Sequence, residues 1–67
     1  MLHLVVNGDD TAVADGATVL DLLTQLGLGP KYVIVERNGE PVERRDVNST
    51  ALADGDRIEL VKAVAGG

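Results

Sequence analysis

The residues with the clearest chemical potential are the last two, Gly66 and Gly67, which follow Ala65 and a predicted strand. Terminal glycines pack against nothing, so the simplest interpretation is a frayed end. A Gly-Gly segment has no Cβ atoms, however, and can pass through a narrow channel. It could therefore carry the Gly67 carboxylate into the reactive centre of another enzyme, and this interpretation gains weight because the pair follows a strand in so small a chain.

The other reactive side chains do not form a catalytic set. His3 is the only histidine, and the 67 residues include no cysteine. The lack of cysteine excludes thiolate catalysis, disulfides and cysteine-ligated metals or iron–sulfur clusters. A catalytic histidine needs a nucleophile and an orienting group within reach, so we expect His3 to be a surface strand residue. We predict that the chain is not itself an enzyme and has no catalytic residue.

Two acidic segments and one basic cluster also have structural explanations. Asp9-Asp10 and Asp54-Gly55-Asp56 look like fragments of metal sites, but a calcium loop needs more oxygen ligands over a longer stretch. Turn chemistry explains both segments, so we predict no metal site. Without a GxGxxG motif or a P-loop, no bound nucleotide or other cofactor is indicated. Arg44-Arg45, with Arg37 nearby, is either a solvated loop or a contact for an acidic patch on a partner.

The net charge limits the possible partners. Lys and Arg number 6 against 11 Asp and Glu, which gives a net charge of −5. This sign disfavours nucleic acids and anionic membranes and favours a partner with a basic surface. No apolar run approaches the roughly 20 residues of a membrane span, and the first six residues resemble a strand rather than a signal peptide. The expected location is therefore the cytoplasm.

Hydrophobic patterning predicts the strands that must position the C-terminus. Strands are expected at residues 2–6, 11–14, 32–37, 41–42 and 57–62. Asn7-Gly8 and Asn38-Gly39 predict hairpin turns, the first of them extending through Asp9-Asp10. Pro41 places its short strand at a sheet edge. Because Tyr32 is the only aromatic residue, the core must be aliphatic.

One helix of about ten residues is predicted from Thr18 onward. Thr18 and Asp21 have the spacing of a capping box, and Gly27 has the position of a C-terminal capping glycine. The apolar face that should enter the core comprises Val19, Leu20, Leu22, Leu23 and Leu26. A single further helical turn is expected at residues 49–53, around Leu52.

The order of these elements indicates an α+β domain in which one helix covers one face of a mixed sheet. The predicted strands place apolar side chains on both faces of the sheet. These residues are Val5, Val33, Val35 and Val61. An uncovered apolar face would be a docking surface, whereas the alternative is that loops cover it.

Several short motifs follow one another along the whole chain. They are Val6-Asn7-Gly8, Gly16-Ala17-Thr18-Val19, Leu22-Leu23, Leu26-Gly27-Leu28, Val33 to Val35 before Asn38-Gly39, Asp54-Gly55-Asp56, Ile58-Glu59-Leu60-Val61 and Ala63-Val64-Ala65-Gly66-Gly67. Each motif is common alone, but their joint order is specific. In this order they resemble the ThiS family of sulfur carrier proteins of thiamine biosynthesis, within the ubiquitin-like β-grasp superfamily. Ala65 stands where the family often has a further glycine.

The resemblance implies a ubiquitin-like β-grasp of four to five strands, with one main helix packed on one face and the first and last strands parallel at the sheet centre. It implies a domain at residues 1–63 and a flexible C-terminal Gly-Gly tail at 64–67. It also implies that a ThiF-like adenylyltransferase uses ATP and magnesium to activate the Gly67 carboxylate. A persulfide sulfur donor then gives a thiocarboxylate, and a ThiG-like thiazole synthase accepts the sulfur. Gly67 is the expected covalent attachment point, and Gly66 and Ala65 give it access.

Three other interpretations remain open. The molybdopterin-synthase sulfur carriers share the fold and tail chemistry, but they tend to be longer and to have proline before the tail, where Lys62-Ala63-Val64 has none. A ubiquitin-like protein modifier would instead join Gly67 to lysines. A passive binding domain would have incidental glycines.

Overall fold

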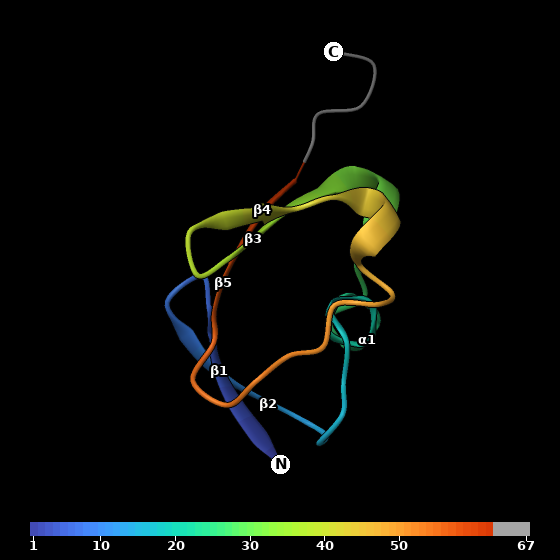
Figure 1. The fold of residues 1–67 in the computed structure, drawn as a ribbon. Helices are drawn as coiled ribbons and strands as arrows, with labels where there is room; N and C mark the ends of the chain where they lie inside the picture. Colours follow the sequence, from blue (N-terminus) through green and yellow to red (C-terminus); the bar gives the residue numbers. More distant parts are fainter. Residues whose placement is uncertain (63–67) are drawn as a thin grey trace.

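A computed structural model of the chain describes residues 1–62, which form a five-stranded mixed sheet and one α-helix. The elements are β1 (Leu2–Val6), β2 (Asp9–Val13), α1 (Val19–Gln25), η1 (Pro30–Tyr32), β3 (Val33–Arg37), β4 (Glu40–Val42), η2 (Arg44–Asp46) and β5 (Arg57–Lys62). Helix α1 lies on one side of the sheet (Figure 1). The predicted β-grasp architecture is confirmed.

The last strand lies in the middle of the sheet. The strand order is β2-β1-β5-β3-β4, so β5 has a neighbour on each side. It runs parallel to β1 and antiparallel to β3, and the two outer pairs are antiparallel hairpins. This is the central parallel pairing of first and last strands that the family resemblance implied.

Both hairpins turn at an Asn-Gly pair whose backbone is left-handed. Asn7 and Gly8 have φ values of 49° and 86°, and Asn38 and Gly39 have 53° and 85°. Positive φ at both central residues is the geometry of the two-residue hairpin that continues the strand twist. Because the first turn uses only these two residues, β2 begins at Asp9, so the predicted extension of this turn through Asp10 was wrong. At the second turn, β4 with its Pro41 is an edge strand, as predicted.

The helix is capped at both ends as predicted but is shorter. The Asp21 backbone N–H donates to Thr18 Oγ1 at 3.3 Å, and the Thr18 N–H donates to Asp21 Oδ2 at 2.8 Å, which completes the capping box. Gly27 has φ 74°, and the Leu28 N–H reaches back to the Leu23 carbonyl at 2.8 Å. This Schellman-type closure ends the helix after seven residues. Within residues 1–62, no helix is long and apolar enough to cross a membrane.

The core is aliphatic and lies between the helix and the sheet. Its buried residues are Leu4, Val6, Val13, Ala17, Val19, Leu22, Leu23, Val35, Val47, Leu52 and Ile58. Leu26 was predicted to be core but is 40% exposed, because the helix ends before it and the chain turns away at Gly27. Tyr32 belongs to η1 rather than to β3 and is 58% exposed.

The connection between β4 and β5 closes the helix side of the core. Its helical turn is η2, not the predicted turn around Leu52. Instead, Ala51 forms an isolated antiparallel bridge with Thr18, and the Leu52 N–H donates to the Ala17 carbonyl at 2.9 Å. Leu52 therefore joins the core through extended backbone pairing with the segment that leads into α1, and not through a helical turn.

Asp56 joins the second hairpin to the start of β5. It is 6% exposed and accepts hydrogen bonds from Arg37 Nε at 2.8 Å, Asn38 Nδ2 at 2.9 Å and the Ala53 N–H at 2.8 Å. Burial acts to raise the pKa of Asp56, but these three donors and the positive charge of Arg37 together hold it below its ordinary value of 3.8. The ionised carboxylate therefore stabilises the fold.

We predict that Leu23→Ala lowers the free energy of unfolding by about 2–5 kcal/mol, because Leu23 is completely buried. Thr24→Ala, on the exposed side of the same helix, should change it by less than about 0.5 kcal/mol. Urea titration of both variants measures the two values. A cost well under 1 kcal/mol for Leu23→Ala would contradict the assigned helix face.

Asp56→Asn should lower stability by about 1–3 kcal/mol near neutral pH, because the amide cannot accept from all three donors. A lowered native pKa contributes stability above the unfolded pKa, and that contribution is lost as pH falls through the native value. The difference between wild type and variant should thus shrink below the ordinary value of 3.8. Denaturation measured at several pH values tests this. A difference that is the same in acid as at neutral pH would refute the role of the ionised form.

Candidate functional site

The predicted reactive end is carried by β5. Ala65, Gly66 and Gly67, and the predicted boundary between domain and tail at residue 63, lie outside the described residues. Lys62, the last described residue, is still in register with Val33 of β3. The strand that leads to Gly67 is therefore paired with β3 as far as Lys62.

The other sequence candidates have structural roles. His3 is an exposed residue of β1, as predicted, and its backbone N–H donates to Asp54 Oδ1 at 2.7 Å. Asp9 and Asp10 are exposed strand residues, and Asp56 is used in the buried network. Across the described part of the chain, no three His, Cys, Asp or Glu side chains gather in a way that could hold a metal ion.

The three arginines of the predicted basic cluster bind separate groups. Arg37 pairs with the buried Asp56, and Arg45 Nε lies 3.2 Å from Glu43 Oε2, where both side chains are exposed. Arg44 Nη2 donates to the Lys31 carbonyl at 3.1 Å. Because each guanidinium is used within the chain, the interpretation as a solvated loop is favoured over an acidic-partner contact.

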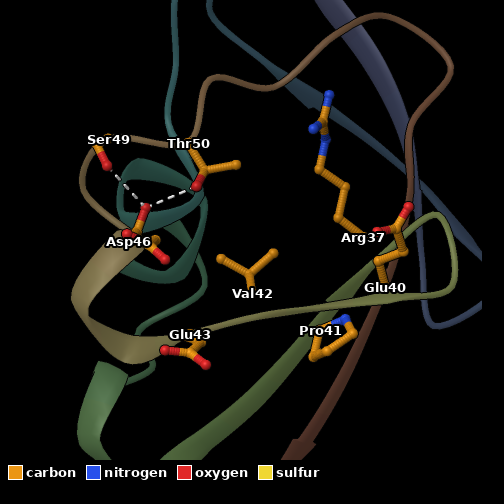
Figure 2. A pocket seen from close by; sticks show the side chains of 8 residues that line it. All are labelled: Arg37, Glu40, Pro41, Val42, Glu43, Asp46, Ser49 and Thr50. Atoms are coloured by element: carbon orange, nitrogen blue, oxygen red, sulfur yellow. Dashed lines mark hydrogen bonds between the residues drawn. The ribbon is translucent and has the colours of Figure 1, made fainter.

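A polar hollow of about 330 Å³ lies between β4 and the segment that follows it. Figure 2 shows Val42 pointing into its middle, with Arg37 and Glu40 on one side and the η2 segment on the other. The hydroxyls of Ser49 and Thr50 both donate to the Asp46 carbonyl. Its lining also includes the ion-paired Arg37 and Glu43. These groups stabilise the loop and do not converge on a common point where a substrate atom could bind.

The face of the sheet away from α1 exposes apolar side chains. Ile34 and Val61 lie opposite each other on β3 and β5 and are 55% and 59% exposed. Val5 of β1 lies on the same face and is half-buried. Of the two alternatives for this face, the open apolar surface is the one observed at Ile34 and Val61.

Two glutamates lie opposite each other on this open face. Glu36 and Glu59 are directly opposite in the β3–β5 register, next to the Ile34–Val61 pair. Neither belongs to any of the three ion pairs found in residues 1–62. Like charges directly opposite are unfavourable in a sheet. The pair was not singled out from the sequence, because only the register brings the two residues together.

Comparison with known proteins decides the family. The ThiS family model matches residues 4–67. The chain belongs to the ThiS family. It is 42% identical over 65 residues to the sulfur carrier protein ThiS of Bacillus subtilis, covering 96% of this chain and 98% of that one. The crystal structure of the thiamine biosynthesis protein ThiS from Geobacter metallireducens superposes with a TM-score of 0.83 at 38% identity, covering 98% of this chain and all of the other.

A second kind of relative is much longer. The chain is 38% identical over 66 residues to a thiazole synthase of Paramagnetospirillum magneticum, covering 98% of this ThiS-family chain but only 20% of the relative. A thiazole synthase of Magnetococcus marinus matches with the same identity and coverage. In these proteins a segment similar to the whole chain is thus one part of a polypeptide about five times as long.

Proposed function

We propose that the protein is a sulfur carrier of thiamine biosynthesis that carries sulfur as a thiocarboxylate on Gly67. The observation that carries the proposal is the match over nearly the whole chain to a sulfur carrier protein ThiS, with 98% of that relative covered. The ThiS family match also extends to the last residue of the chain. A central β5 leading toward Gly67 is consistent with this role.

The chemistry follows from the poor reactivity of a carboxylate as an electrophile. In the proposed first step, a Gly67 carboxylate oxygen attacks the α-phosphorus of ATP, pyrophosphate leaves, and an acyl-adenylate forms. The terminal sulfur of a persulfide then attacks the acyl carbon and AMP leaves. A thiol reduces the resulting acyl disulfide, releasing the thiocarboxylate and a mixed disulfide.

The catalytic groups for these steps would belong to partner enzymes. A ThiF-like adenylyltransferase would bind the ATP and magnesium, so the carrier supplies only a reachable carboxylate and a surface to be recognised. Such a division of labour agrees with the place of His3 as an exposed strand residue and with the use of Asp56 in the buried network. It also agrees with the proposal that the chain acts as a co-substrate and not as an enzyme.

Thiazole synthase is the proposed acceptor of the sulfur. Two relatives named thiazole synthase each contain a segment similar to this chain. A covalent connection of this kind keeps a carrier-like segment and the rest of the synthase in one polypeptide, and we propose that this chain gives its sulfur to a ThiG-like thiazole synthase.

We propose further that the adenylyltransferase docks on the open sheet face. Ile34 and Val61 supply exposed apolar area, and the unpaired Glu36 and Glu59 would be neutralised by a basic side chain of the partner. The net charge of −5 would steer the chain toward the same basic surface.

The sequence contains no cysteine, so a thiol-like group on the chain would have to come from the proposed reaction. After incubation with the adenylyltransferase, ATP, magnesium and sodium sulfide, the chain should become reactive toward iodoacetamide, because a thiocarboxylate would be its only thiol-like group. Alkylation is needed because replacement of oxygen by sulfur and oxidation of Met1 increase the mass of the chain by almost the same amount. The added alkyl group distinguishes the two products. Intact mass spectrometry should show one alkyl group per chain, dependent on ATP.

The matched control is the chain lacking Gly67, which keeps Met1 and should take up no alkyl group. It should also keep the unfolding midpoint of the full chain. A full-length chain that consumes ATP but stays unlabelled would overturn the thiocarboxylate proposal. Lysine-linked adducts in its place would support a protein modifier.

The docking face generates a separate prediction. In the double variant Ile34→Ser and Val61→Ser, the KM for carrier-dependent pyrophosphate release should rise about tenfold or more, because two apolar side chains no longer become buried on binding. The free energy of unfolding should change by less than about 1 kcal/mol, since both side chains are already exposed. Leu26→Ser, an exposed aliphatic change on the helix side, is the control and should leave the KM unchanged. An unaltered KM in the double variant would place docking elsewhere.

A further inference from the structure

The side chain of Asn7, which directly follows β1, forms hydrogen bonds with the neighbouring strand β5. Its Oδ1 accepts from the Leu60 backbone N–H at 2.7 Å, and its Nδ2 donates to the Leu60 carbonyl at 3.2 Å. The two residues are 53 positions apart in sequence. One side-chain amide thus satisfies both backbone groups of a residue in the strand that leads toward Gly67.

This contact begins where the regular parallel pairing ends. The Asn7 backbone N–H donates to the Ile58 carbonyl at 2.9 Å. Along the direction of β1, this is the last hydrogen bond between the backbones of β1 and β5. At Gly8 the backbone has φ 86° and turns away toward β2. If β1 had continued, its backbone would have supplied the next acceptor and donor to Leu60. The amide of Asn7 replaces both, because it carries one acceptor and one donor as a peptide group does.

Leu60 lies two residues before the end of β5, so this contact acts on the part of the strand nearest the proposed reaction. Without Asn7, Leu60 would be paired only to β3, on one side, as Val61 and Lys62 are in the sheet register. A strand segment paired on one side has an unpaired row of backbone groups and opens more readily than one paired on both.

We propose that Asn7 is a positioning residue for the activation of Gly67: its amide holds the end of β5 in the sheet and so sets the point from which the reactive carboxylate is delivered to a partner. The inference rests on the proposed function, since it assigns Asn7 a part in the same reaction. The role is indirect, because Asn7 acts through Leu60.

The requirement of a hairpin turn does not explain these bonds. Positive φ at this position would be met by glycine as well as by asparagine. The second hairpin supplies a matched comparison, because Asn38 has nearly the same φ and also bonds to β5, with its Oδ1 accepting from the Arg57 N–H at 2.9 Å. Asn38 therefore holds the beginning of β5, and Asn7 holds its end.

The test compares Asn7→Gly with Asn38→Gly in the full chain. Glycine accepts both backbone conformations, so each variant removes one side-chain clamp without straining its turn. Carrier-dependent pyrophosphate release by the adenylyltransferase gives kcat and KM. Amide hydrogen exchange at Leu60, measured by NMR at a temperature where all variants are folded, reports the strand end directly.

For Asn7→Gly we expect kcat to fall roughly five- to tenfold with the KM for the carrier within twofold of wild type, which is the change expected from losing one or two hydrogen bonds. Exchange at Leu60 should accelerate by a similar factor. Asn38→Gly should lower the unfolding midpoint yet leave kcat and the Leu60 exchange near their wild-type values.

An unchanged kcat in Asn7→Gly, or an equal loss in Asn38→Gly, would overturn the inference, because the first shows no positioning and the second shows only general destabilisation. Wild-type chain that supports no pyrophosphate release would instead refute the proposed function. The exchange rate at Leu60 would still show in that case whether Asn7 holds the strand end, so the two failures are distinguishable.

Discussion

The parallel pairing of β1 with β5 is the constraint on which the rest of the structure depends. Parallel neighbours cannot be joined by a tight turn, so the chain between them must cross over, and here it supplies the helix, the second hairpin and the closing loop. The result places the final strand between two others, with its start held by Asp56 and Asn38 and its end by Asn7. The strand that leads to the last residues therefore lies at the centre of the sheet, between β1 and β3.

The placement of side chains accords with a protein that is acted upon. Helix and closing loop together cover one face of the sheet, and the buried polar groups there serve the fold. The opposite face retains exposed aliphatic side chains and two facing carboxylates. In an isolated domain this arrangement gains no stability. Under the docking proposal, a partner that buries the apolar area and supplies positive charge would make the arrangement favourable.

Local signals predicted most of the elements, because they are settled by neighbouring residues. Both Asn-Gly turns form, although the first is shorter than predicted because β2 begins at Asp9. The Thr18–Asp21 capping box and the Gly27 stop form as their spacing indicated. One error arose where a long-range contact decides, because Leu52 is buried by pairing with Ala17 and not by a helical turn. Leu26 was misplaced for a local reason, since the helix ends before it and the chain turns at Gly27. The facing glutamates and the Asn7–Leu60 contact depend on register between distant strands, which no local pattern encodes.

Localisation of the transferred sulfur tests the central claim most directly. The chain would be treated with adenylyltransferase, ATP, magnesium and sulfide, alkylated, digested, and sequenced by tandem mass spectrometry. Our account predicts a single alkylated sulfur bonded to the carbonyl carbon of Gly67, and unmodified peptides elsewhere. Sulfur bonded at any other residue, or a Gly67 carboxylate that stays intact while ATP is consumed, would contradict it.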